Sequence, residues 1–242
     1  MKQWTPLYIT ITFFLSSNIV HAEKNNDDFR FALTPYLWAA SLNGTVATDG
    51  ESSPPIDSDY NFFSLDNVDG VASATFTARK NNWGILFDYL YVAYEDIFFE
   101  STLKQITPRL EGTVIELTGT YSPSQINNFE IIAGLRQQDI TVSLAILNKA
   151  PEQSVTWLDP LVGIIYTHNM TTDFDLILRG DLGGFGIESD LATNAEVTLR
   201  YQMNDIFDLK LGYRYLKVKF DDKDFIYDIS LNGFLFGLTA NF

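Results

Sequence analysis

Cysteine is absent from the 242-residue sequence, and histidine occurs only twice. The missing cysteine excludes a disulfide scaffold and any zinc site built from cysteine ligands. No stretch after the N-terminal segment contains about 18 unbroken apolar residues, so a membrane-spanning helix is not expected. Basic residues are also few, with 16 Lys and Arg against 31 Asp and Glu. Nucleic acid, whose phosphates would be repelled, is therefore not an expected partner.

Aromatic residues, by contrast, are abundant, at 14% of the chain, and hydrophobic residues make up 46%. This composition excludes intrinsic disorder, because a chain so rich in apolar side chains can bury a sizeable core. The length fits one domain and does not require a second.

Residues 1–22 have the three parts of a cleaved signal peptide. Lys2 supplies a positive start, Leu7 to Leu15 form an apolar stretch, and Val20-His21-Ala22 precede the expected cleavage before Glu23. The alternative is a membrane anchor, but the apolar stretch is about half the length of a spanning helix. We expect an exported chain with a single domain over 23–242, with 15 basic residues after the loss of Lys2, 31 acidic residues and a net charge of −16.

Apolar and polar residues alternate with a period of two through the whole mature chain. In the segment 207–215, Phe207, Leu209 and Leu211 share one face, while Asp208 and Lys210 occupy the other. Similar alternation occurs in 84–91, 113–121, 174–182, 194–201 and 234–242. The pattern predicts many β-strands that each have one apolar and one polar face.

Two classes of all-β protein fit this alternation. A soluble sandwich or barrel would place the apolar face inside, whereas a transmembrane barrel would place it against lipid. Aromatic residues lie near the expected strand ends, as interface girdles require, at Trp83, Tyr89, Tyr91, Tyr121, Tyr201, Tyr213 and Tyr215. Charges of both signs lie at mid-strand on the polar face, and the last strand ends on Phe242. These features favour an outer-membrane β-barrel.

Short and long connections alternate along the chain, as in barrels with tight periplasmic turns and longer outward loops. The expected strands are ten: 28–46, 71–80, 83–95, 112–121, 128–138, 154–166, 173–184, 192–201, 206–219 and 228–242. An even number of strands places both ends of the chain in the periplasm. Eight strands remain an alternative if one hairpin lies outside the membrane.

Several segments resemble a family of small proteobacterial outer-membrane β-barrel proteins, most of them uncharacterised. They are Phe31 to Trp38, Leu42 to Gly44, Trp157 to Gly163, Arg179 to Gly186, Gly212 to Tyr215 and Gly237 to Phe242. The resemblance covers nearly all of the mature chain and implies location in the cell outer membrane. The last segment is also similar to the signal read by the barrel assembly machinery, with Gly237, Ala240 and Phe242 at its key positions and the apolar Leu235 where a polar residue is usual. The resemblance thus implies that machinery as a partner during biogenesis.

The polar face carries a set of charges that we expect to face the lumen. The acidic members are Asp88, Glu116, Glu130, Asp159, Asp181, Glu196 and Asp208, and the basic members are Arg136, Arg179, Arg200, Lys210 and Arg214. One interpretation is a network that braces and fills a narrow barrel, because unpaired buried charge is costly. The other is a polar path for small solutes. Barrels of about eight strands are filled by side chains, and open channels need about 16, which favours bracing.

No catalytic, metal or cofactor site is expected. The only histidine of the mature chain, His168, falls in an expected turn, and no nucleophile, base and orienting group can be assembled around it. Acidic residues at Asp57, Asp59, Asp66 and Asp69 lack the spacing of a calcium loop. The glycine-rich motif 180–186 lacks the following helix that a phosphate site requires. Its glycines, together with Gly163 and Gly212, are expected to permit bends and make room for aromatics. An outer-membrane hydrolase is the weaker alternative.

The sequence therefore predicts an integral outer-membrane β-barrel, either a narrow channel for small solutes or a plugged barrel that displays acidic loops. Its expected surroundings are outer-membrane lipid and lipopolysaccharide. A monomer is expected, because a closed barrel has no free strand edge that demands a partner.

Overall fold

The structure is a computed structural model of the chain. It describes residues 28–48, 56–60, 68–95, 106–124, 128–146, 152–222 and 225–242. The expected signal peptide, residues 1–22, lies outside the described residues. Within the described ranges there is no helix long and apolar enough to cross a membrane.

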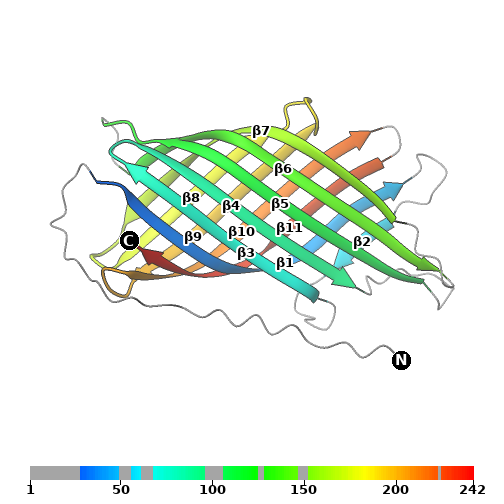
Figure 1. Cartoon of the computed structure of the whole chain (residues 1–242), viewed down its shortest axis with the longest axis horizontal. Helices are drawn as coiled ribbons and strands as arrows, with labels where there is room; N and C mark the ends of the chain where they lie inside the picture. The colour runs from blue at the N-terminus through cyan, green and yellow to red at the C-terminus, as the bar shows by residue number, and fades with distance from the viewer. Residues whose placement is uncertain are drawn as a thin grey trace.

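Eleven strands make up the described part of the chain. They are β1 (Arg30–Thr48), β2 (Ile56–Tyr60), β3 (Val68–Lys80), β4 (Trp83–Glu95), β5 (Ile106–Tyr121), β6 (Phe129–Ile146), β7 (Glu152–Asn169), β8 (Phe174–Gly183), β9 (Leu191–Gln202), β10 (Phe207–Asp222) and β11 (Phe225–Asn241). Each pairs antiparallel with its neighbour, and β11 pairs back onto β1, so that ten strands close a barrel (Figure 1). The short β2 pairs only with the outer part of β1. The expectation of a closed ten-stranded antiparallel barrel is thus confirmed.

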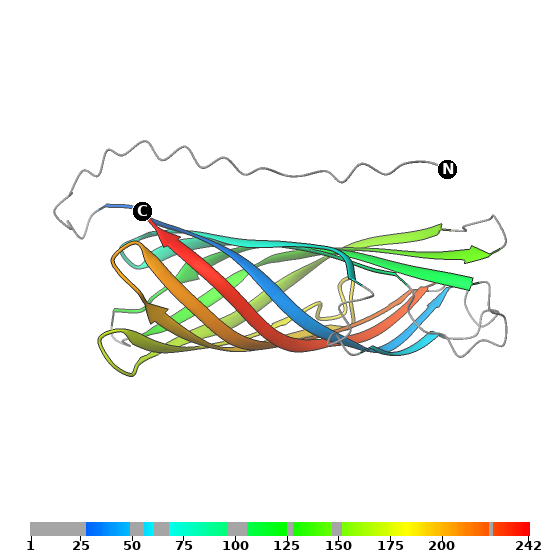
Figure 2. The ribbon, with the colours of Figure 1, turned by 90° about the horizontal axis from the view of Figure 1, so that it is seen from below.

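The wall closes where the first and last strands meet (Figure 2). Fifteen residue pairs join β1 to β11, from Ala32–Asn241 to Thr48–Phe225. Phe31 and Phe242 exchange two backbone hydrogen bonds, with N···O distances of 2.9 and 3.0 Å. The other side of β1 is less paired, because only six pairs, from Arg30–Arg79 to Pro35–Ala74, join it to β3.

Tight turns lie at the same end of the barrel as Phe242. Between β3 and β4, Asn81 takes a left-handed φ of 53°, which asparagine tolerates. Between β9 and β10, the Asn204 side-chain oxygen accepts hydrogen bonds from the backbone N–H groups of Ile206 (2.9 Å) and Phe207 (2.8 Å). Tight turns are typical of the periplasmic end of such barrels, so the opposite end faces outward.

Several strands extend further outward than the sequence predicts. The expected strands 112–121 and 128–138 are too short, since β5 begins at Ile106 and β6 ends at Ile146. The alternation of apolar and polar residues fades there, but backbone pairing needs no such alternation. The expected turn at Thr167 to Thr172 is also partly wrong, because β7 continues to Asn169 and includes His168.

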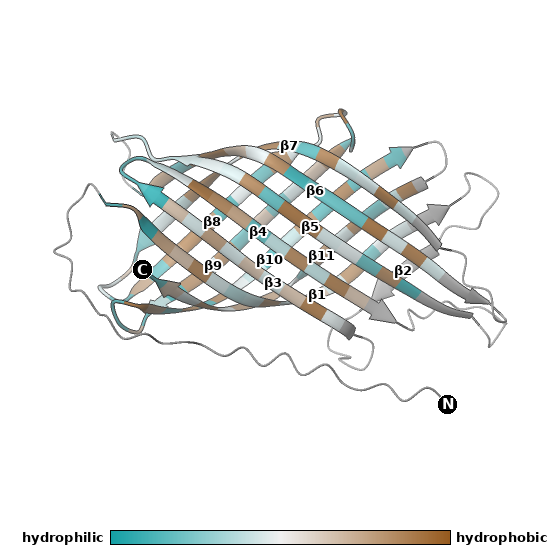
Figure 3. Ribbon diagram, in the orientation of Figure 1, coloured by the Kyte–Doolittle hydropathy of each residue, from teal (hydrophilic) through white to brown (hydrophobic). Residues whose placement is uncertain are grey.

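The outer surface of the barrel is apolar over its central part. Large side chains point away from the lumen along every hairpin, and Leu117, Leu135, Leu211 and Phe236 are each about half exposed. Figure 3 shows apolar and polar residues alternating along the strands. Rings lie over the periplasmic ends of the strands, where Trp83 contacts Tyr121 at 4.6 Å between centroids. This apolar band with aromatic residues at its edge is the surface that a bilayer covers.

The lumen has two halves of different character. Toward the tight turns its side chains are mainly polar, whereas the outward half is lined by a buried apolar cluster. On β10 the change occurs in two residues, because Arg214 faces the lumen and the next inward positions are Leu216 and Val218. The boundary between these halves is where the candidate site lies.

Candidate functional site

Seven inward side chains form what we call the charged layer, which crosses the lumen at the boundary between its halves. Backbone register sets their common level, since Asp88 is directly opposite Glu116 across β4 and β5. Glu116 is in turn opposite Arg136 across β5 and β6. The members are Asp88, Glu116, Arg136, Arg179, Asp181, Asn194 and Arg214.

Arg136 is the hub of the charged layer. Its Nη2 donates to Glu116 Oε2 at 2.8 Å and to Asp181 Oδ1 at 2.7 Å, and its Nε donates to the same Glu116 oxygen at 3.2 Å. Glu116 and Asp181 come from β5 and β8, which β6 and β7 separate in the wall. One guanidinium therefore connects strands that are not neighbours.

Arg179 makes the same connection from the other side. Its Nη2 donates to Glu116 Oε1 at 2.5 Å, and its Nε donates to Asp181 Oδ2 at 2.9 Å. Two arginines and two carboxylates thus form a closed four-membered ring of ion pairs. Charge-assisted hydrogen bonds of this kind are stronger than neutral ones, and guanidinium geometry suits paired contacts.

Asn194 and Arg214 continue the layer to the remaining strands. Asn194 Nδ2 donates to Asp181 Oδ2 at 2.8 Å, and Arg214 Nε donates to Asn194 Oδ1 at 2.9 Å. Arg214 Nη1 lies 3.6 Å from Asp88 Oδ2, and its guanidinium carbon lies 5.0 Å from the centroid of the Trp38 ring. Asp88 also accepts hydrogen bonds from the hydroxyls of Tyr36 (3.0 Å) and Thr75 (2.6 Å).

Burial shows that the charged layer fills the cross-section of the barrel. Glu116 and Arg136 are 0% exposed, and Asp88, Asp181 and Arg214 are at most 4% exposed. Water therefore has almost no access to these side chains from either side of the layer. Buried charges are tolerated when they are paired and hydrogen-bonded, as these are.

The loop after β8 folds inward against Asp159. Ser189 is fully buried and donates to this carboxylate twice, from its backbone N to Oδ1 at 3.0 Å and from Oγ to Oδ2 at 2.7 Å. Trp157 Nε1 also donates to Oδ2, at 3.1 Å. Gly184, at φ +84°, lies at the start of this loop and contacts Ser189 so closely that a Cβ there would lie 2.3 Å from its Oγ. Nothing in the alternation of residues indicates this inward loop.

The other sequence-predicted luminal charges lie on the inner face but outside the charged layer. Arg200 bonds to Asp175, with an Nε–Oδ2 distance of 2.9 Å. Lys210 Nζ lies 3.4 Å from Thr34 Oγ1. Glu196, opposite Arg214 in register, accepts a 2.7 Å hydrogen bond from Thr198.

Two further predicted acids lie toward the tight turns. Glu130 forms an ion pair with Arg79 at 2.5 Å, and Asp208 accepts from Asn241 at 3.0 Å. Among the described residues, the polar half of the lumen therefore holds several separate pairs, whereas the charged layer is one connected network.

Three buried polar atoms among the described residues have no hydrogen-bond partner. They are Glu130 Oε2, Arg136 Nη1 and Gln138 Nε2. The last two belong to neighbouring inward positions of β6. An unpaired buried donor costs about 1–3 kcal/mol, so each is a place where a ligand atom would gain a hydrogen bond.

Glycines next to the charged layer make room for polar groups, not for the aromatics that the sequence suggested. A Cβ at Gly163 would lie 2.5 Å from the Asp181 Cβ, and one at Gly212 would lie 2.4 Å from the Thr198 hydroxyl. The expected role of these two glycines in accommodating rings is therefore wrong.

The segment expected to carry the assembly signal forms the end of the last strand. Gly237 faces the lumen opposite Tyr36, Ala240 lies opposite Leu33, and Phe242 is exposed next to Phe31. Its recognition by an assembly machinery stays a prediction.

Acidic loop residues lie mostly where side chains are not described. Asp57 and Asp59 fall in β2, and Asp66 lies outside the described residues. In the ranges that the structure describes, no group of three or more His, Cys, Asp or Glu is placed to hold a metal ion.

Comparison with known proteins supports the fold. No family model matches the chain, and no curated protein matches its sequence. Among solved structures, the outer membrane protease OmpT from Escherichia coli is similar with a TM-score of 0.53 at 9% identity, over 92% of this chain and 99% of that one. The Ail protein of Yersinia pestis has a TM-score of 0.42 at 11% identity, covering 89% and 99% of the two chains. Neisserial surface protein A has a TM-score of 0.36 at 10% identity, covering 89% and 100%.

At 9% identity, the OmpT likeness shows a shared barrel fold and no more. The closed barrel and its apolar exterior, together with that fold, identify this chain as an integral outer-membrane β-barrel protein.

Proposed function

We propose that this protein is a closed outer-membrane barrel that acts as a membrane-embedded scaffold and binding protein, and that it is not an open diffusion channel. The observation that supports the proposal is the burial of the charged layer, where Glu116 and Arg136 are 0% exposed. A diffusion path would require hydrated side chains at every level of the lumen. Ten strands also lie close to the size at which side chains fill a barrel.

The proposal includes no catalytic step. The two carboxylates of the ion-pair ring, Glu116 and Asp181, have both oxygens engaged by arginines or Asn194. A general acid or base needs an oxygen free to reach a substrate proton. The partners that we include are the lipid and lipopolysaccharide around the apolar exterior.

Planar-bilayer conductance of the refolded chain 23–242 tests the proposal. Heat-modifiable gel migration first establishes that the barrel is folded, and a large-pore porin refolded in the same way serves as the assay control. We expect a folded barrel without discrete conductance steps and without flux of small sugars or amino acids from vesicles. Reproducible, ion-selective steps from the folded protein would contradict the closed state and would favour the narrow channel that the luminal charges also suggest.

A further inference from the structure

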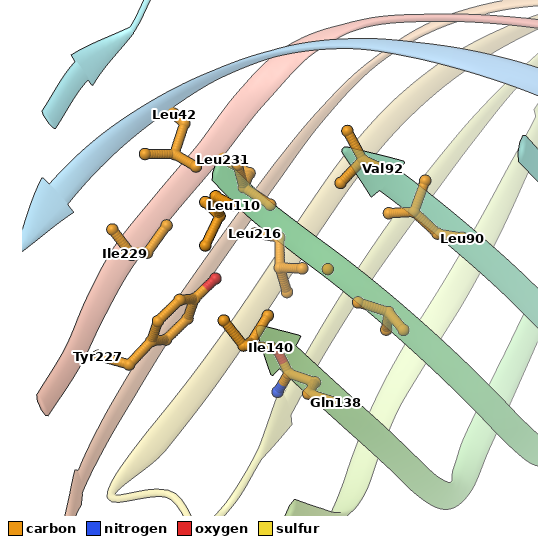
Figure 4. A pocket seen from close by; sticks show the side chains of 12 residues that line it. Leu42, Leu90, Val92, Leu110, Gln138, Ile140, Leu216, Tyr227, Ile229 and Leu231 are labelled. Atoms are coloured by element: carbon orange, nitrogen blue, oxygen red, sulfur yellow. The ribbon is translucent and has the colours of Figure 1, made fainter. Parts of the chain in front are cut away.

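The outward half of the lumen contains a cavity lined almost entirely by apolar side chains (Figure 4). We call it the outer-lumen cavity. Its walls come from six strands, β1, β4, β5, β6, β10 and β11, and they include Leu42, Leu90, Leu110, Ile140, Leu216 and Tyr227. Leu90, Ile140 and Leu216 are at most 4% exposed. The cavity volume is about 30 Å³.

Two of the lining side chains carry polar atoms, Gln138 and Tyr227 (Figure 4). Gln138 is 1% exposed, and its Nε2 has no hydrogen-bond partner. Gln138 is opposite Val114 in register, one inward position beyond the Arg136–Glu116 pair. It therefore lies at the inner end of the cavity, directly above the charged layer, and presents an unused donor.

Water is a poor occupant of this position. A buried water needs two to four polar partners, and the side chains that line the outer-lumen cavity offer few besides Gln138 and the Tyr227 hydroxyl. A ligand that carries one acceptor atom on an aliphatic body would satisfy the amide and also bury its carbon atoms against the leucines. Each methylene that leaves water for these walls adds to the affinity, which a water molecule cannot do.

The charged layer next to Gln138 determines whether the acceptor group of a ligand can carry a charge. Its three guanidiniums, on Arg136, Arg179 and Arg214, are matched by three carboxylates, on Asp88, Glu116 and Asp181, and Glu196 is opposite both Arg179 and Arg214 in register. A ligand carboxylate would add a further negative charge to a layer whose arginines are already matched, and it would lose its own hydration. An uncharged acceptor, such as a hydroxyl or ketone oxygen, avoids both costs.

The volume of the cavity decides the shape of the ligand. About 30 Å³ is room for about two water molecules, so only a narrow end group fits beside Gln138. An aromatic ring is too wide for this space without repacking. An unbranched chain can place its polar end there and extend outward along the apolar walls.

From these observations we infer that the outer-lumen cavity binds the polar end of an uncharged, unbranched aliphatic molecule, such as a medium-chain alcohol or ketone, with Gln138 as the hydrogen-bond donor. The inference rests on the proposed closed state, because the charged layer is the floor of the cavity. It adds the chemical class of the ligand to the binding role proposed above.

Titration of the barrel in lipid nanodiscs tests the inference. Isoleucine methyl groups and glutamine side-chain amides are isotope-labelled, and 1-octanol, 2-octanone, octane and octanoate are added in turn, with empty nanodiscs correcting for partition. We expect saturable shifts of the Ile140 methyl and Gln138 amide signals with octanol and octanone. Octane should bind about tenfold more weakly, the ratio that one net hydrogen bond provides. Octanoate should also bind more weakly, because its charge would be buried next to the charged layer.

Three variants make the result specific to the cavity. Gln138→Leu should remove the preference for octanol over octane, and Leu216→Phe should abolish saturable binding by filling the cavity. Leu211→Phe introduces the same ring on the lipid-facing side of the same strand and should change nothing. Val114→Ile, which adds one methylene to the wall, replaces Leu216→Phe if that variant fails to fold.

Shifts that only follow partition into lipid, or binding that is unchanged in both Gln138→Leu and Leu216→Phe, would overturn the inference. A signal from Gln138 that shows bound water, with no response to any of the four compounds, would also overturn it. Conductance is read separately on the same protein. A silent barrel without these shifts therefore contradicts only the ligand, whereas a conducting barrel contradicts the proposed function itself.

Discussion

Arg136 and Glu116 face each other across β5 and β6, and each is 0% exposed although each carries a charge. Their 2.8 Å contact joins two neighbouring strands, and the 2.7 Å contact from Arg136 to Asp181 joins β6 to β8, which β7 separates. The pair therefore links strands that are not neighbours, and loss of either partner leaves the remaining buried charges with fewer opposite charges around them.

Arg136→Leu is expected to destabilise the barrel by about 3–5 kcal/mol, because Glu116 and Asp181 remain buried with fewer donors. Urea unfolding in lipid vesicles measures the change. The control is Lys217→Leu, which removes a 3.5 Å ion pair with Asp228 on the exposed outward part of β10 and β11. That variant should cost at most about 1 kcal/mol. Equal effects of the two substitutions would show that the charged layer does not brace the barrel.

Ser189→Ala should release the loop that follows β8. The substitution removes the 2.7 Å hydrogen bond to Asp159 and is expected to cost about 1–3 kcal/mol, because the carboxylate is buried. Hydrogen exchange over 184–190 should become faster. Glu188→Ala, at an exposed position of the same loop, should leave the exchange unchanged. Unaltered exchange in both variants would mean that the hydrogen bond does not hold the loop.

Leu117→Lys places a charge on the lipid-facing surface, next to Glu116 in sequence and at the level of the charged layer. Leu117 is 54% exposed on the barrel exterior, and the substitution should cost about 2–4 kcal/mol in a bilayer. Folding yield and unfolding free energy in vesicles provide the measurement. Ile187→Lys, at a 66% exposed position of the loop after β8, should be nearly neutral. A neutral Leu117→Lys would contradict the assigned position of the bilayer.

Leu33→Cys with Phe76→Cys should form a disulfide across β1 and β3, since the two residues are directly paired. The native chain has no cysteine, so the bond is the only one that can form. It should raise the temperature at which heat-modifiable migration is lost.

The matched pair is Leu37→Cys with Phe236→Cys, which joins β1 to β11. Because β1 has six pairs with β3 and fifteen with β11, the first disulfide should stabilise the barrel more than the second. An equal or larger effect at the β1–β11 contact would show that the shorter ladder is not the weaker part of the wall.

Sequence alone predicts the barrel, its ten strands and the face on which each residue lies. The reason is that a strand between lipid and a polar lumen repeats its environment every two residues. Leu209 therefore indicates the lipid side of its strand, and Lys210 indicates the lumen side. The outward ends of the strands were less predictable. Beyond the membrane both faces of β5 and β6 can carry polar side chains, and the hydrogen bonds of the ladder leave no pattern in the sequence.

The sequence also could not predict which partners the inward charges contact. Asp159 is opposite Arg136 in register, yet its hydrogen bonds come from Trp157 and from Ser189 in an inward loop. Arg136 turns instead toward Glu116 and Asp181. Long arginine side chains reach across a narrow lumen, so pairing depends on the curvature of the wall. The sequence also did not predict the apolar outward half of the lumen. Inward residues such as Leu216 are apolar there, so the alternation of apolar and polar residues breaks down within a single strand.

The hydrogen bonds between Phe31 and Phe242 also constrain the order in which the barrel is built. They join residues 211 positions apart, so this contact closes almost the largest loop that the described chain can form. Neighbouring hairpins can pair early at little entropic cost, but the wall cannot close until the last strand is in place. Until then β1 and β11 each expose a long unpaired edge, and the intermediate is an open, curved sheet. We therefore expect closure to be the late, slow event of assembly, and the open sheet to be the species most prone to aggregate.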